Sequence, residues 1–191
     1  MPEPSFAELM EAMKSAAGIL QRSEVPFVLG GGLSAWARGG PKSEHDVDFL
    51  VRPKDADAAL AAFESAGWRT ERPPEGWLYK VWHENGTLVD LIFNPAGGPI
   101  TDELIERAPV AEVMALRLNI STLEDAMTAK LMAITEQEPD FGASLEWARA
   151  LREQIDWDTV RRRTEASPFA KAFFTLVEAL GIVDPETVGA K

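Results

Sequence analysis

Hydrophobic residues recur every three or four positions near the start of the chain, and this spacing predicts an amphipathic helix. The residues that form the repeat are Phe6, Leu9, Met10, Met13 and Leu20. Ser5 and Glu8 lie at the start of the repeat with the spacing of a capping box, in which each side chain hydrogen-bonds the backbone of the other residue. The first element is therefore expected to be a helix that starts just after Ser5.

Shorter apolar or alternating runs follow, and these predict strands. The predicted strands cover residues 26–29, 47–51, 68–72, 78–82 and 88–93. Three consecutive glycines at positions 30, 31 and 32 separate the first strand from a short predicted helix over 33–38. An alanine-rich helix is expected between Asp55, as its N-cap, and Gly67, as its end, and the pair Asn85 and Gly86 predicts a hairpin turn.

Beyond Pro99 the hydrophobic pattern is mostly helical. Ser121 and Glu124 have the spacing of a second capping box, and Asp156 and Ser167 are suitable N-caps for the last two helices. The chain thus changes from mixed helices and strands to helices alone in its second half.

This order of elements predicts an α/β (α+β) fold in which a mixed sheet with flanking helices is followed by a C-terminal helical bundle. We expect a core domain over residues 1–115 and a C-terminal helical region over 116–191 that packs on it. A chain of 191 residues with 46% hydrophobic residues is long and apolar enough to form a real core.

Charge and composition narrow the classes of function. The formal net charge is −12, which makes the chain a poor general binder of nucleic acid but is compatible with a site that collects divalent cations. The sequence has no cysteine, so disulfides, thiolate metal sites and cysteine nucleophiles are excluded. No apolar run approaches the roughly 18 residues of a membrane span and the start does not resemble a signal peptide, so we expect no membrane partner and a cytoplasmic protein.

The most informative motif is a pair of acids in the second predicted strand. Asp46 and Asp48 are two residues apart, so their side chains share one face of the strand about 7 Å apart. Carboxylates this close repel each other unless a cation lies between them, and magnesium prefers such oxygen ligands. A solvated pair on an exposed strand is the simpler alternative for an isolated Asp-X-Asp.

The surroundings of this pair favour the metal site. The glycine run lies upstream, where a backbone without side chains can approach a phosphate group closely. Downstream, Asp90 stands in the middle of an apolar strand, where an acid costs free energy unless it is paired or bound to metal. If the strands of Asp48 and Asp90 are neighbours in the sheet, the three carboxylates converge.

A glycine turn, a short helix, an Asp-X-Asp strand and a lone Asp on a later strand together resemble the polymerase-β-like nucleotidyltransferase superfamily. The resemblance covers about residues 26–93. It implies an enzyme of EC 2.7.7 type that uses Mg²⁺ (or Mn²⁺) and a nucleoside triphosphate (NTP). Asp46, Asp48 and Asp90 would be its metal ligands and catalytic residues. Nucleotide binding would fall to Gly31, Gly32 and Ser34, although many members have a serine where Gly32 stands.

The second half resembles one branch of this superfamily, the AbiEii/MenT-like toxin nucleotidyltransferases of toxin–antitoxin systems. The similarity lies in the helix that contains Lys130 and in Asp140 shortly after it. In this branch Lys130 would be catalytic and would face the nucleotide phosphates, with Asp140 also nucleotide-binding. The resemblance implies modification of tRNA and a cognate antitoxin protein as partner. Arginines in the helical half could form a phosphate-binding face or a solvated face balanced by nearby acids.

Two alternatives remain open from the sequence. The glycine turn and the acid pair also resemble the aminoglycoside and lincosamide nucleotidyltransferases, which are short acidic proteins that modify an antibiotic hydroxyl. A non-catalytic module that binds a nucleotide or a partner is the other alternative, although such a module has no need of three mutually repelling acids.

Overall fold

A computed structural model describes residues 4–43 and 45–185, and its centre is a five-stranded mixed sheet. The strands are β1 (Phe27–Leu29), β2 (Asp46–Val51), β3 (Arg69–Glu71), β4 (Leu78–Trp82) and β5 (Leu88–Ile92). Their order in the sheet is β1-β2-β5-β4-β3, with β2 and β5 parallel and every other pair antiparallel. The predicted mixed sheet is confirmed.

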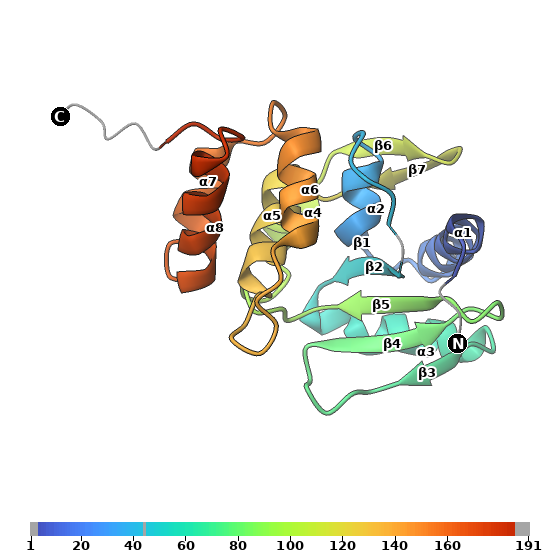
Figure 1. Cartoon of the computed structure of the whole chain (residues 1–191). Helices are drawn as coiled ribbons and strands as arrows, with labels where there is room; N and C mark the ends of the chain where they lie inside the picture. Colours follow the sequence, from blue (N-terminus) through green and yellow to red (C-terminus); the bar gives the residue numbers. More distant parts are fainter. Residues whose placement is uncertain (1–3, 44, 186–191) are drawn as a thin grey trace.

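One face of the sheet packs on α1 (Phe6–Arg22) and α3 (Ala56–Ser65); in Figure 1 α3 lies behind β4 and α1 is seen nearly end-on at the right. Alternate residues of β2, namely Val47, Phe49 and Val51, are buried on this side. The predicted capping box at the start of α1 is present, since the side chains of Ser5 and Glu8 each hydrogen-bond the other's backbone. The residues between the buried positions of β2, which include Asp46 and Asp48, point to the opposite face.

Helix α2 (Gly31–Trp36) covers the β1–β2 end of that opposite face. It begins two residues earlier than expected, because Gly30 is its N-cap and the next two glycines form its first turn. Asp55 occupies the N-cap of α3, but it makes no capping bond because its carboxylate binds Arg52 instead. It also ends η1 (Pro53–Asp55), a short 3₁₀ turn.

Two elements between the sheet and the C-terminal helices were not predicted: α4 (Asp102–Arg107) and a hairpin of β6 (Val110–Val113) and β7 (Leu116–Asn119). The hairpin turn places Met114 and Ala115 at positive φ angles of 51° and 66°. Such two-residue turns normally contain glycine, asparagine or aspartate, so the sequence offers no turn signal here.

The remaining helices are α5 (Leu123–Met132), α6 (Gly142–Leu151), α7 (Trp157–Arg163) and α8 (Pro168–Ala179), and they lie together beside the sheet in Figure 1. They share a hydrophobic cluster of their own, which Ala35 of α2 joins. The N-caps predicted at Asp156 and Ser167 are confirmed. The second capping box is wrong, because the N-cap of α5 is Thr122, whose hydroxyl accepts from Asp125 N.

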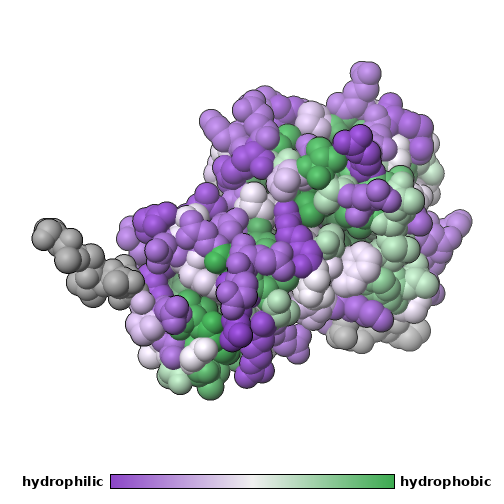
Figure 2. All heavy atoms as spheres, turned by 90° about the horizontal axis from the view of Figure 1, so that it is seen from above, coloured by the Kyte–Doolittle hydropathy of each residue, from purple (hydrophilic) through white to green (hydrophobic). Residues whose placement is uncertain are grey.

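Hydrophilic side chains cover much of the face shown in Figure 2, and smaller apolar areas lie between them. No helix within the described ranges is long and apolar enough to cross a bilayer.

Candidate active site

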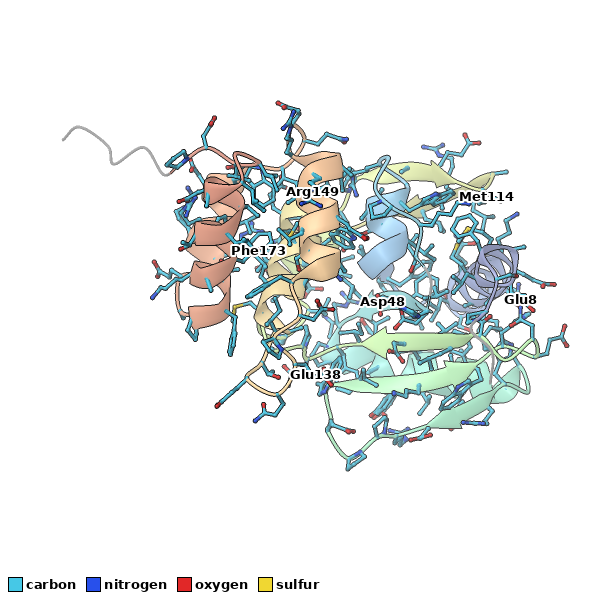
Figure 3. All side chains as sticks on the ribbon, in the orientation of Figure 1. Glu8, Asp48, Met114, Glu138, Arg149 and Phe173 are labelled. Atoms are coloured by element: carbon cyan, nitrogen blue, oxygen red, sulfur yellow. The ribbon has the colours of Figure 1, made fainter. Side chains whose placement is uncertain are left out.

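The register of the two parallel strands brings the three predicted acids together. Asp48 of β2 lies directly opposite Asp90 of β5, and Asp46 is two residues earlier on the same face of β2. One carboxylate oxygen from each of the three lies within 4.8 Å of the others. In Figure 3 Asp48 lies near the middle of the molecule, between the sheet and α2. The structure therefore places the acids of two separate strands in one cluster.

The pKa values of all three carboxyl groups are raised, and burial is the largest cause in each case. For Asp48, the negative charges of Asp46 and Asp90 add to burial and raise the pKa well above its ordinary value. The pKa of Asp90 rises to about 7 through burial and the charge of Asp46. His45 opposes the shift in the pKa of Asp46 most strongly, followed by Lys130 and Lys80. Lys130 also opposes the shift of Asp48, and Lys80 that of Asp90. The basic side chains near the cluster therefore do not offset the burial and mutual repulsion of the three carboxylates.

The cluster has the properties of a site for a hard divalent cation. The carboxylate oxygen Oδ1 of Asp90 is buried and has no hydrogen-bond partner among the described residues. Buried polar atoms are rarely left unpaired, and a bound ion is one of the partners that can satisfy them. Three carboxylates are ligands that Mg²⁺ and Mn²⁺ accept, and a cation among them would offset their mutual repulsion. The residues present therefore fit the metal that the fold family implies.

Glycine is required where α2 begins beside the cluster. Gly31 has φ of +51°, and a Cβ atom at this position would overlap the carboxylate of Asp48. A Cβ atom on Gly32 would press on the hydroxyl of Ser43. Gly30 N also donates to the Asp48 carbonyl at 2.9 Å, which ties the turn to β2. The turn can approach the acids this closely only because it has no side chains.

The other predicted residues differ in how they lie relative to the cluster. Lys130 of α5 has its ammonium group 4.8 Å from the ring centre of Trp147 and close enough to act on Asp46 and Asp48. Asp140 is exposed, and its Oδ1 accepts a 2.7 Å hydrogen bond from Gly142 N at the start of α6. Ser34 is fully buried and its hydroxyl donates to the Gly31 carbonyl at 2.8 Å.

A cleft of about 1070 Å³ opens over this part of the sheet. Gly31, Gly32, Asp46, Asp48, Lys130 and Asp140 all line it, whereas Ser34 is not part of its lining. The loop between α5 and α6, on which Figure 3 labels Glu138, also contributes to the cleft lining. A volume of this size accommodates a nucleotide with a second substrate beside it.

A family model described as "nucleotidyl transferase of unknown function (DUF2204)" matches residues 9–173. The chain belongs to this family of nucleotidyl transferases. No curated protein matches the chain by sequence.

Solved nucleotidyltransferases share the fold of this family member. The solution structure of the antibiotic-resistance factor ANT(2'')-Ia has a TM-score of 0.61 and 16% identity, and the match covers 90% of this chain and 96% of that one. The lincosamide antibiotic adenylyltransferase LnuA has a TM-score of 0.51 and 13% identity, over 76% and 97% of the two chains. An antigenic nucleotidyltransferase-like protein from Paracoccidioides brasiliensis has a TM-score of 0.53 and 12% identity, over 93% and 91%.

Several charged residues of this nucleotidyl transferase reach the site or its cleft without a signal in the sequence. Lys80 lies opposite Asp90 in the β4–β5 ladder, which only the register shows. Arg107, Asp125 and Arg163 line the cleft from three different helices, and both arginines bind Asp125. No motif connects these three positions, so the sequence alone does not group them.

Proposed function

We propose that the chain transfers a nucleoside monophosphate from an NTP to an acceptor hydroxyl, and that Asp46, Asp48 and Asp90 hold the divalent metal ion this reaction needs. The observation that supports this most directly is the convergence of three carboxylates within 4.8 Å, with one buried oxygen unpaired among the described residues. Membership of a nucleotidyl transferase family supports the class of reaction.

Apart from Ser34, which is buried outside the cleft lining, the predicted residues have roles that their positions support. When bound, the metal ion neutralises phosphate charge and orients the reacting groups. Gly31 and Gly32 line the cleft and expose the backbone of their turn to the triphosphate, and Lys130 adds a positive charge from α5. Asp90 helps remove the proton from the acceptor hydroxyl. The hydroxyl oxygen bonds to the α-phosphorus, and the bond from that phosphorus to the pyrophosphate leaving group breaks.

For the acceptor, we propose first a tRNA end, as in the AbiEii/MenT-like toxins, with a cognate antitoxin as protein partner. The position of Lys130 on a helix that faces the acids supports this branch. The wider arginine surface gives less support, because Arg161 and Arg163 pair with Glu178 and Asp125, and Arg152 pairs with Glu153. Asp140 precedes the N-cap Phe141, accepts a hydrogen bond from Gly142 N at the start of α6, and lines the cleft.

The second candidate acceptor is an antibiotic hydroxyl. The supporting observation is the overall fold, since two of the similar structures are those of an antibiotic-resistance factor and of a lincosamide antibiotic adenylyltransferase. Acidic side chains at the cleft rim, Glu138 and Glu146, would suit a cationic acceptor.

Incubation with each labelled NTP and Mg²⁺ or Mn²⁺ tests these proposals. Total tRNA and a panel of aminoglycosides and lincosamides are offered in separate reactions. Label on RNA supports the toxin-like enzyme, and label on a drug supports the antibiotic-modifying enzyme. If no NTP gives transfer to either acceptor class and no Mg²⁺–nucleotide binding is measurable by calorimetry, the proposed function is wrong.

A further inference from the structure

Two arginines share one buried carboxylate in the cleft, outside the acid cluster. Arg107, at the end of α4, donates from Nε to Asp125 Oδ2 at 2.9 Å and from Nη2 to Oδ1 at 2.7 Å. Arg163, at the end of α7, donates from Nη1 to the same Oδ1 at 2.8 Å. We call these three residues the arginine pair site.

The site presents positive charge to the cleft. The Asp125 side chain is only 8% exposed, whereas each arginine side chain is 40% exposed, and all three residues line the cleft. Burial by itself would raise the pKa of Asp125, but hydrogen bonds and charge from Arg107, with the charge of Arg163, lower it. Two guanidinium groups on one carboxylate leave a net charge of +1 in a chain whose total is −12.

The carboxylate also orients the two guanidinium groups. Asp125 accepts from two nitrogens of Arg107, which fixes that guanidinium plane, and from one nitrogen of Arg163, which holds that group at one point. Each group keeps further N–H donors. Pre-organised arginine forks are well suited to bind phosphate or carboxylate oxygens, because little side-chain entropy remains to be lost. The geometry is that of an anion subsite.

The cleft also has apolar lining near the acid cluster and on α4, the helix of Arg107. Leu50 and Ile92 follow Asp48 and Asp90 by two residues on the same face of the sheet. Leu104 precedes Arg107 by one turn of α4 and so lies on the same side of that helix. These three apolar residues line the same cleft as Asp46, Asp48 and the two arginines. A sugar or ring can lie on this apolar lining, beside the polar groups of the cleft.

We propose that the arginine pair site binds a phosphate group of the acceptor while the acceptor hydroxyl lies at the acid cluster. This rests on the proposed function and narrows it to acceptors that carry a phosphate near the attacking hydroxyl. Under the proposed function the triphosphate is bound by other residues of the same cleft, namely Gly31, Lys130 and the acid pair Asp46 and Asp48. A polycationic acceptor would gain nothing from the two arginines.

Calorimetry with two phosphate-bearing probes tests the proposal. The probes are the dinucleoside phosphate cytidylyl-adenosine, which represents an RNA end, and ribose 5-phosphate, which represents a phosphorylated small molecule. Both are titrated into the full chain with Mg²⁺ and the non-reactive analogue α,β-methylene-ATP. Cytidylyl-adenosine with an uncharged methylphosphonate linkage and free ribose are the ligand controls.

At least one phosphate probe should bind the wild-type protein, and its uncharged counterpart should bind roughly tenfold more weakly or worse. Arg107→Gln and Arg163→Gln should each lower the affinity of the protein for the phosphate probe by a similar factor. Arg163→Lys keeps the positive charge beside Asp125 but lacks the planar set of guanidinium donors. Its affinity for the phosphate probe should therefore lie between those of the wild type and Arg163→Gln. Arg149→Gln, an exposed arginine outside the cleft lining, is the matched control and should bind like wild type.

The affinity for Mg²⁺ and α,β-methylene-ATP separates this proposal from the proposed function. It should stay unchanged in the arginine variants. If these variants lose nucleotide affinity and keep phosphate-probe affinity, or if neither phosphate probe binds the wild type, the acceptor subsite is wrong. If the phosphate probes bind through the arginines but no nucleotide binds, the subsite stands and the proposed function fails.

Discussion

At the scale of single residues, the acid cluster lowers the stability of the folded protein when no cation is bound. Asp48 is the central member, because it lies opposite Asp90 in the ladder and two residues from Asp46. Its pKa is raised through burial and through both neighbouring charges. Activity and stability should therefore respond to this residue in opposite directions.

Asp48→Asn should lower nucleotidyl transfer by more than roughly 100-fold. Loss of a residue that only supports a metal ligand costs up to about 100-fold, and Asp48 is proposed as a ligand itself. In EDTA the same variant should melt a few degrees above wild type, since relief of about 1 kcal/mol corresponds to roughly 2–4 °C for a chain of this size. Transfer assays and thermal melts measure the two effects. Asp158→Asn, an exposed acid on α7, is the control and should change neither. Retained activity in Asp48→Asn would contradict the site.

The raised pKa of Asp90 predicts how stability depends on pH. Its folded-state pKa of about 7 lies above the ordinary value of 3.8, so between these values the folded state binds more protons than the unfolded state. The stability of the metal-free protein should therefore fall as pH rises from about 5 to 8, and the raised pKa values of Asp46 and Asp48 act in the same direction.

Thermal melts in EDTA over this pH range, repeated with Mg²⁺, measure the effect. Mg²⁺ should stabilise most at the alkaline end, where the carboxylates are ionised. Asp90→Asn should reduce the slope in EDTA. A melting temperature in EDTA that rises from the acid to the alkaline end of the range would show that the cluster does not carry these shifts.

At the scale of elements, the start of α2 and the start of β2 depend on each other. The positive φ of Gly31 and the space it leaves open allow the Asp48 carboxylate to lie against the helix. Gly39 also has a positive φ, of +92°, but a Cβ atom there would meet nothing within 4 Å. Both glycines therefore have a backbone conformation that other residues rarely adopt, but only Gly31 has a side chain, that of Asp48, in the space that a Cβ atom would fill.

Gly31→Ala should cost both the backbone penalty of roughly 1–2 kcal/mol and the displacement of Asp48, so transfer should fall by at least about tenfold. Gly39→Ala should cost a similar backbone penalty while transfer per folded molecule stays near wild type. Thermal melts and specific activity distinguish these outcomes. Equal activity in both variants would mean that the close approach of Gly31 to Asp48 does not matter for catalysis.

At the scale of the whole molecule, Asp125 joins three helices that are far apart in the sequence. It receives hydrogen bonds from Arg107 of α4 and Arg163 of α7 while standing in the first turn of α5. Asp102 makes a comparable set of contacts, with Arg52 and Lys54, but its side chain is 53% exposed. Each of these two aspartates therefore binds two basic side chains, but the Asp125 carboxylate is nearly buried and the Asp102 carboxylate is exposed.

Asp125→Asn should lower the free energy of unfolding by about 1–3 kcal/mol, because two charged hydrogen-bond donors lose their partner. The loss should not be larger, because both arginines are partly exposed and water can solvate them. Asp102→Asn should cost less than about 1 kcal/mol, as surface ion pairs usually do. Chemical denaturation of both variants makes the comparison. A larger loss for Asp102→Asn would mean that burial does not set the strength of these contacts.

The sequence alone was sufficient for most local structure and for the identity of the acid cluster. Helices with capping residues and strands with a clear period, such as α1 and β2, were predicted because their signals lie within a few neighbouring residues. The Asp-X-Asp pair and Asp90 stood out because an acid in an apolar strand demands a partner. The hairpin at Met114 was missed because its turn has residues that rarely adopt positive φ.

Only the tertiary structure decided which groups meet. The parallel pairing of β2 and β5, with Asp48 opposite Asp90, follows from packing of the whole sheet and not from either strand by itself. Lys80 was brought to the cluster by the β4–β5 register, and Arg107, Asp125 and Arg163 by the packing of three helices. Local propensity acts over a few residues, whereas a site needs contacts between residues that are distant in the chain. Those contacts exist only once the core has formed.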